Sequence, residues 1–395
     1  SSKLIIMAVY KLFPSKDASI YSGYPAMNAG LDPILDVANL VTDINPVAKV
    51  ARSLIKFDQS QIEDVIDNIA KVTGSWDNFS GSLKLNVAKA TNVILKSKIE
   101  VYPISGSWNN GSGQYLDKPV NHTGASWVYS DFSGSNKWST GGFNPLITAS
   151  FSGSNNAGGG TWYTGSGGYE GIGPLEFTQS FNLRSDKDLD VNITDALRVW
   201  YSSSKGLNAG KIEIENQGFI VKWENNKEFV TESAITPQLS YYSIDTNTIY
   251  PPQLEIKWDD SVYNTGSLDV IATPDLFVAL DNNQGIFYSE SINNFRLSVR
   301  PEFPIRSFQT ASVYTTNYAL PSQSLYAIKD LDTNEYVVDF DKEFTNISCD
   351  STGSFFTVYM NGLEPERYYC ILIQTEIAGQ TIVMDENYYF KVVNG

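Results

Sequence analysis

The chain has 395 residues, with 28 Lys and Arg against 44 Asp and Glu, and a formal net charge of −16. This acidic balance argues against nucleic acid or an anionic membrane as the main partner, and no apolar run reaches the length of a membrane span. One His and two Cys leave little material for a histidine-based triad, a zinc site or a redox pair. The length allows two or three domains, each with its own core.

The N-terminal segment carries no recognisable export signal. Residues 1–6 are interpreted either as a short leader without a cleavage site or as residues foreign to the natural chain, because MAVYKLFPSKDASIYS from Met7 onward resembles the beginning of a structural protein. Cys349 and Cys370 can pair in principle, but two cysteines do not make a disulfide framework. Free thiols in the core are therefore the favoured interpretation.

Strand-like alternation dominates the chain from the first hundred residues to its end. Leu83 and Leu85 alternate with polar neighbours, and Ile99 and Val101 repeat the pattern. Similar short runs, bounded by Asn, Gly, Pro or Ser, occur at 212–214, 219–221, 239–241, 254–256, 337, 356–358 and 389–393. The pattern predicts a mainly β protein whose strands bury one face.

Two segments carry helical spacing instead. Ser60 and Glu63 form a capping-box pattern ahead of an apolar series, which predicts a helix over 60–72. Residues 194–200 place Ala196, Leu197 and Trp200 on one side of a second, short helix.

A stretch rich in glycine and aromatic residues at about 130–175 predicts an insertion or an exposed loop system. It contains Trp138, Trp162, Tyr163 and Tyr169. Exposed aromatic rings can stack on sugars or fill a protein interface, and the same composition also suits packing within the loops. If the stretch binds a ligand, these four residues are the candidate binding residues.

The remaining charged residues favour structural roles. Arg52 and Lys56 lie near Asp58 in one predicted strand, where an ion pair or a solvated strand end is a simpler interpretation than a binding site. His122 is predicted to lie in a loop. The aspartates of 186–190 lack the glycine and distal Glu of an EF-hand loop, so we expect a loop that leads into the second helix. Since no local pattern selects a catalytic carboxylate pair, we predict no catalytic residue, no metal and no cofactor.

The order of segments in the first 260 residues resembles the DNRLRE-type jelly-roll domain. The stretches that carry the resemblance are DASIYSGYPAMNAGLDPILDV (17–37), ARSLIKFD (51–58), LKLNVAK (83–89), KIEVYPISGSWNNG (98–111), LDVNITDALRVWY (189–201), GFIVKWE (218–224) and YYSIDTNTIYPPQLEIKWDD (241–260). The resemblance implies a jelly-roll β-sandwich over residues 1–260, interrupted by the insertion. The chain departs from the family after Trp108, where Asn109 and Asn110 replace the usual acidic residue and second Trp.

Residues 261–395 resemble immunoglobulin-like or fibronectin-like β-sandwiches. The stretch GLEPERYYC (362–370) is similar to the corner of such domains, where a tyrosine locks the turn before a strand. The resemblance assigns this structural role to Tyr368. The sequence leaves open whether 261–310 belongs to the sandwich or forms a connecting strand exchanged between subunits.

The jelly roll, the terminal sandwich and the MAVYKLFPSKDASIYS opening together resemble structural proteins of tailed, cyanophage-like bacteriophages. The resemblance implies a non-enzymatic virion component of the tail, neck or capsid, made in the host cytoplasm. Its expected partners are other copies of itself and other virion proteins, held by oligomeric β-sandwich contacts, with no nucleic acid or membrane. The alternative is a carbohydrate-binding adhesin that contacts host surface polysaccharide. Sparse cysteine agrees with assembly in a reducing compartment.

Overall fold

The computed structural model describes residues 8–39, 49–93, 96–138, 147–149, 158–163, 175–207, 213–228, 237–259, 261–304 and 316–395. The chain divides into two compact units. The first unit comprises Leu12–Asp64 and Ser80–Glu255, and the C-terminal unit comprises the N-terminal residues up to Lys11, Val65–Phe79 and Ile256–Gly395. The main division lies near the boundary predicted after residue 260, but two early segments join the C-terminal unit.

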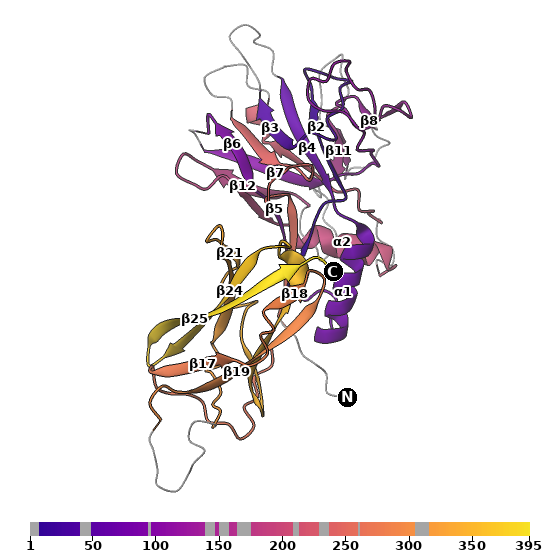
Figure 1. Ribbon diagram of the computed structural model, residues 1–395. Coiled ribbons are helices and arrows are strands. Elements are labelled where there is room, and N and C mark those ends of the chain that lie inside the picture. The colour runs from indigo at the N-terminus through magenta and orange to yellow at the C-terminus, as the bar shows by residue number, and fades with distance from the viewer. Residues whose placement is uncertain are drawn as a thin grey trace. The chain divides into compact units, whose positions relative to one another are not determined.

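The predicted fold class is confirmed, because the described residues are mainly β-strands in sandwich-like sheets with few helices (Figure 1). The strands of the first unit are β2 (Lys16–Tyr21), β3 (Ile34–Asn39), β4 (Val50–Lys56), β5 (Ser80–Leu85), β6 (Val87–Thr91), β7 (Ser97–Pro103), β8 (Tyr129–Asp131), β9 (Asn136–Lys137), β10 (Ile147–Ala149), β11 (Thr161–Tyr163), β12 (Phe177–Phe181), β13 (Leu189–Asn192), β14 (Phe219–Trp223) and β15 (Gln238–Tyr242). Three elements cross the division between the units: β1 (Ala8–Leu12), α1 (Gln59–Thr73) and β16 (Gln253–Trp258).

One large antiparallel sheet organises the first unit. Its strands follow the order β12-β7-β14-β4-β3-β15-β6, and β4 also pairs with β2. β5 pairs with β13, and the short ribbons β8-β9 and β10-β11 come from the predicted insertion. Of the run predicted at 212–214, residues 213 and 214 lie outside any strand, the Ile214 side chain is buried, and residue 212 lies outside the described residues.

Both predicted helices exist. In α1 the N-terminal cap is Asp58 rather than Ser60, because the Asp58 Oδ1 accepts the amide protons of Ser60 at 2.8 Å and Gln61 at 3.3 Å. α2 (Thr194–Ser204) packs Trp200 on Phe219 of β14, with ring centroids 4.8 Å apart. A third helix, α3 (Asn225–Glu228), is a single turn that follows β14. None of the helices described here is long and apolar enough to cross a membrane.

The C-terminal unit contains β17 (Leu276–Leu280), β18 (Ile286–Tyr288), β19 (Ile292–Pro301), β20 (Leu325–Asp330), β21 (Tyr336–Val338), β22 (Ser348–Asp350), β23 (Gly353–Tyr359), the 3₁₀ turn η2 (Met360–Gly362), β24 (Tyr368–Ile377) and β25 (Gln380–Val393). One sheet has the order β17-β19-β23-β22 and the other β18-β25-β24-β20-β21. This is the strand arrangement of the immunoglobulin fold. The segment 276–301, whose place the sequence left open, belongs to this sandwich.

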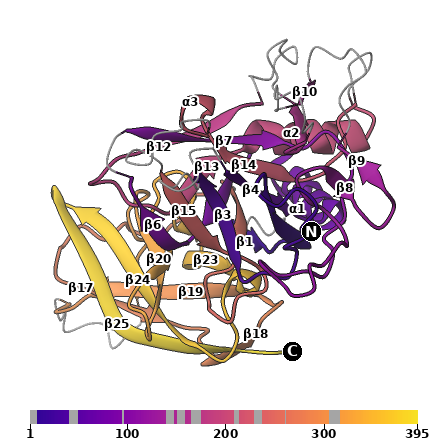
Figure 2. The ribbon, with the colours of Figure 1, turned by 90° about the horizontal axis from the view of Figure 1, so that it is seen from above.

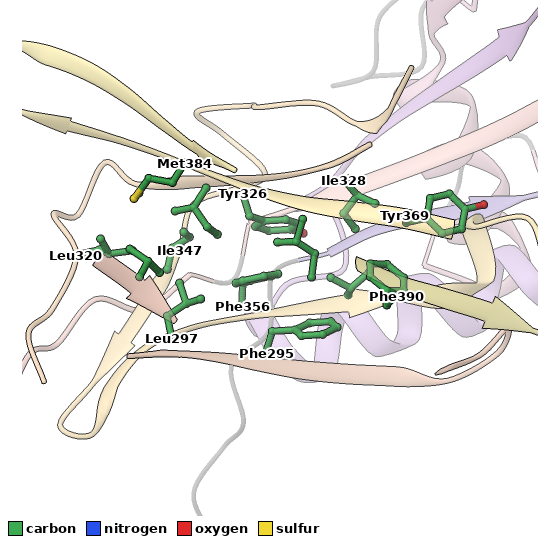
Figure 3. Close-up of a cluster of buried hydrophobic side chains, with 14 of the residues drawn as sticks. Phe295, Leu297, Leu320, Tyr326, Ile328, Ile347, Phe356, Tyr369, Met384 and Phe390 are labelled. Carbon is green, nitrogen blue, oxygen red and sulfur yellow. The ribbon is translucent and has the colours of Figure 1, made fainter. Parts of the chain in front are cut away.

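Aromatic side chains fill the space between the two sheets of the C-terminal unit. Phe356 stacks on Tyr326 at 4.5 Å and on Phe295 at 5.5 Å. Figure 3 shows the labelled members of this core, among them Phe295, Leu297 and Phe356 from the first sheet and Tyr326, Ile328, Tyr369 and Phe390 from the second. Alternate residues of each strand form this core, because successive side chains along a strand point to opposite faces of the sheet.

Candidate functional site

The aromatic residues predicted to bind a ligand are mostly buried. Trp138 and Trp162 are each 4% exposed and belong to one apolar cluster of the first unit. Trp138 Nε1 donates to the Ser126 carbonyl at 2.9 Å, and Trp162 stacks on Tyr102 at 5.7 Å. Neither ring offers an exposed face for stacking on a sugar, and this favours the alternative that the aromatic residues pack within the loops. The glycine-rich stretch packs part of its aromatics into the core instead.

The other two residues of that prediction have different positions. Tyr163 is half-buried at the end of β11, and burial raises the pKa of its hydroxyl, with a smaller contribution from Glu215. Tyr169 lies outside the described residues.

A buried network of charges lies beside Trp162. Arg52 is fully buried and binds Glu228 through two hydrogen bonds, from Nε at 2.8 Å and from Nη2 at 2.7 Å. Lys222, also buried, lies 3.0 Å from Glu100 and 3.6 Å from Glu228. Burial raises the pKa of the Glu100 carboxyl, but the ammonium groups of Lys222 and Lys98 outweigh burial, so its net pKa is lowered.

The same arginine ties the glycine-rich segment to the sheet. Arg52 Nη1 donates to the Gly159 carbonyl at 2.6 Å, and its guanidinium lies 4.9 Å from the Trp127 ring and 5.4 Å from the Trp162 ring. Gly159 has φ +84°, and a Cβ there would lie 2.6 Å from Arg52 Nη1. Only glycine fits this approach. The network pairs two cations with two carboxylates and holds the insertion in place.

The sequence favoured an ion pair or a solvated strand end for Arg52, and the structure gives an ion pair. The partner is Glu228 rather than the nearby Asp58, which caps α1. No local signal marks Glu228, because its position near Arg52 depends on the pairing of β14 with β4. His122 lies in a loop as predicted, and its ring stacks on Phe132 at 5.0 Å.

The tyrosine that locks the corner of the C-terminal sandwich is Tyr369, not Tyr368. The Tyr369 hydroxyl donates to the Glu364 carbonyl at 3.0 Å, and its ring is buried in the core. Tyr368 points to the other face of β24 and is 52% exposed. Successive residues of a strand face opposite sides, so an assignment that is one residue off exchanges a core residue for a surface residue.

Tyr368 lies on the exposed face of the sheet β18-β25-β24, and this face is the strongest candidate for an interaction surface. On the sheet β18-β25-β24, Ile286, Lys391 and Tyr368 lie directly opposite one another in a row across the three strands. Tyr288 of β18 and Tyr389 of β25 point to the same face. We call Ile286, Tyr288, Tyr368 and Tyr389 the aromatic face. Figure 2 shows β25 as the long strand beside β24 that ends near β18.

The aromatic face exposes large apolar side chains together. Ile286 is 60% exposed, Tyr288 63% and Tyr389 44%. Lys391 lies among them, with its ammonium 5.8 Å from the Tyr368 ring and paired with Glu366. The strand β18 borders the described sheet, so the face ends at a sheet edge. Chemically, the surface combines apolar area, three phenol hydroxyls and one cation, a composition suited to contact with another protein.

Within the described ranges, no group of three or more His, Cys, Asp and Glu residues is placed to hold a metal ion. Asp186 and Asp188 lie in a loop, as predicted, but Asp190 belongs to β13, so the segment enters a strand before it reaches α2. Cys349 and Cys370 are both buried and free, which agrees with the favoured interpretation.

Comparison with known proteins gives little further information. No family model matches the chain, and no curated protein matches it. Among solved structures, a Parabacteroides merdae β-glucuronidase is similar at 10% identity with a TM-score of 0.14. The match covers 79% of this chain and 28% of the glucuronidase, and at this score it carries no argument about fold or function.

Proposed function

We propose that the chain is a non-enzymatic structural protein that assembles through the aromatic face of its C-terminal unit. The observation that carries the proposal is the exposure of Ile286, Tyr288, Tyr368 and Tyr389 on one face of one sheet. Contiguous exposed apolar side chains on a soluble domain mark an interaction site. Tyrosine is enriched in such sites because its ring buries much area while its hydroxyl stays hydrated or bonded.

The first partner to test is a second copy of the chain, because most assembling proteins form symmetric contacts with themselves. The border strand β18 adds a second means of contact, since unpaired strand edges accept a further strand. The assignment of the assembly to a bacteriophage particle rests on the sequence resemblance alone. In that setting, other virion proteins are the further partners.

Light scattering over a concentration series tests the proposal with the full chain. We expect the wild type to associate, and the double variant Ile286→Ser with Tyr288→Ser to remain monomeric at the same concentrations. Both side chains are more than half exposed, so the folded state tolerates their replacement. The matched control is Phe303→Ser, which removes an apolar side chain that is 79% exposed elsewhere in the same unit.

A wild type that stays monomeric at every concentration, or a control that dissociates as fully as the double variant, would contradict the proposal. Circular dichroism of each variant separates loss of contact from loss of fold.

A further inference from the structure

The C-terminal unit has an open polar hollow beside the first residues of β19. Its volume is about 480 Å³, within the range of roughly 300–1,000 Å³ typical of ligand sites. It is lined by the loop 281–284 and by Asn293 and Asn294, and Phe287 is its one apolar lining residue. Four of the lining side chains are asparagines, one is a glutamine and one is an aspartate.

One of the asparagines fixes the loop. Asn283 Nδ2 donates to the Tyr389 carbonyl at 2.9 Å, and Asn283 Oδ1 accepts from the Gly285 amide at 2.9 Å. Asn283 thus uses both ends of its amide group on the protein. The loop that forms one wall of the hollow is anchored to β25.

The other polar side chains keep hydrogen-bonding capacity for a ligand. The structure gives no hydrogen bond to the side chains of Asn282 and Gln284 from any residue that it describes. Asn293 uses its Nδ2 on Ser291 Oγ at 2.7 Å, and Asn294 uses its Nδ2 on Thr357 Oγ1 at 3.1 Å. The two residues follow one another in β19, so their side chains point to opposite faces, and Asn294 is directed to β23. The carbonyl oxygen of Asn293 remains for other partners.

The aspartate adds a further acceptor. Asp281 lines the hollow and accepts a hydrogen bond from Ser298 Oγ at its Oδ2, at 2.7 Å, so that its Oδ1 has no hydrogen bond from the described residues. The hollow is therefore lined by two complete amide groups, each both donor and acceptor, together with the acceptor oxygens of Asp281 and Asn293.

The hydrogen-bond donors and acceptors that line the hollow indicate a class of ligand. A hydroxyl group is both donor and acceptor, so a compound with several adjacent hydroxyls can use the amide donors and the acceptor oxygens together. A hard cation fits less well, because only one lining residue is a carboxylate and cation affinity grows with ligand charge. We propose that the hollow binds a neutral saccharide unit. The proposal is independent of assembly through the aromatic face.

Saturation-transfer-difference NMR on the full chain tests the proposal with glucose, galactose, mannose, N-acetylglucosamine and their common disaccharides. We expect transfer to at least one sugar, and about tenfold weaker binding for the double variant Asn282→Ala with Gln284→Ala, because two hydrogen bonds are lost. The matched control is Gln323→Ala with Gln374→Ala, which removes two amides from a separate polar hollow of about 360 Å³. The control is expected to bind like the wild type.

Three results would overturn the proposal. The first is no transfer to any sugar, the second is equal loss in the control variant, and the third is wild-type affinity in the Asn282/Gln284 variant. Calorimetry with Ca²⁺ alone tests for a cation site. A heat of Ca²⁺ binding that is present in the wild type and lost in the Asn282/Gln284 variant, in a protein that binds no sugar, would also contradict the saccharide proposal. Light scattering of the variant is expected to match the wild type, so failure here is separable from failure of the assembly proposal.

Discussion

At the scale of single residues, the interior of the first unit depends on charges that strand alternation does not predict. β7 was expected to bury one face, yet Glu100 and Tyr102 are buried as well as Ile99 and Val101. The reason is non-local, because Lys222 of β14 and Trp162 of the insertion cover the second face. A sequence pattern reports the polarity of one strand and cannot report what other strands place above it.

The Arg52 network leads to a stability prediction. We expect Arg52→Met to lower the free energy of unfolding by about 3 kcal/mol, because it removes one partner of a buried ion pair and the bond to Gly159. Urea denaturation followed by tryptophan fluorescence measures the effect. The control is Arg296→Met, whose ion pair with Asp350 is over a third exposed and is expected to matter by less than about 1 kcal/mol. Equal losses in the free energy of unfolding for both variants would show that the buried network stabilises the fold no more than an exposed ion pair does.

The corner tyrosine gives a paired comparison of neighbours. Tyr369→Phe removes the hydroxyl that donates to Glu364, and we expect a loss of about 1 kcal/mol in the free energy of unfolding. Tyr368→Phe removes an exposed hydroxyl and is expected to change it by less than about 0.5 kcal/mol. Thermal and urea unfolding of the two variants check this. A larger loss in the free energy of unfolding for Tyr368→Phe than for Tyr369→Phe would indicate that Tyr368 is the locking residue.

At the scale of elements, the sequence predicts which segments are strands or helices better than it predicts their ends. Alternation located β5, β14, β23 and β25, and apolar spacing located α1 and α2. The start of α1 was assigned to the wrong capping residue, because Ser60 and Glu63 match a capping-box pattern, whereas the actual cap, Asp58, lies two residues earlier. The choice follows from where the chain leaves β4, which places the Asp58 carboxylate over the first free amides of the helix.

The cap assignment is testable by substitution. Asp58→Ala is expected to lower the free energy of unfolding by about 1 kcal/mol, because two amides at the helix start lose their acceptor. Ser60→Ala keeps that acceptor and should cost less than half as much. Urea denaturation of both variants measures the difference. A larger loss in the free energy of unfolding for Ser60→Ala than for Asp58→Ala would indicate that Ser60 is the capping residue.

A buried carboxyl in β2 makes stability depend on pH. Asp17 is 1% exposed and accepts a hydrogen bond from the Ile244 amide at 2.8 Å. Burial raises the pKa of Asp17 to about 7, although this hydrogen bond opposes the shift. The unfolded chain titrates near pH 4, so between about pH 4 and pH 7 the folded chain holds a proton that the unfolded chain has released. The stabilisation from this group is therefore lost as pH rises through that window.

The variant Asp17→Asn keeps an acceptor for Ile244 but cannot ionise. We expect its urea midpoint to fall less than that of the wild type between pH 5 and pH 8. The comparison is made at constant ionic strength so that screening of surface charges does not change. Identical pH profiles for the two proteins would mean that Asp17 does not titrate in this range.

At the scale of the whole molecule, the prediction of a mainly β chain with a C-terminal immunoglobulin-like sandwich holds, whereas two of the four candidate binding residues, Trp138 and Trp162, are buried. The sequence drew attention to the tryptophans of the insertion because glycine and aromatics together are typical of binding loops. The structure buries the described tryptophans of that stretch and exposes Tyr288, Tyr368 and Tyr389 of the C-terminal unit instead. Tyrosines in strands of alternating polarity give no local sign of which ones stay exposed.

The measurement that tests assembly through the aromatic face most directly is hydrogen–deuterium exchange of the wild type, read by mass spectrometry at low and high protein concentration. We expect slower exchange at high concentration in peptides that cover Ile286–Tyr288 and the start of β24, with the first unit unchanged. Exchange that is independent of concentration in these peptides, or protection confined to other segments while the chain associates, would contradict the proposal.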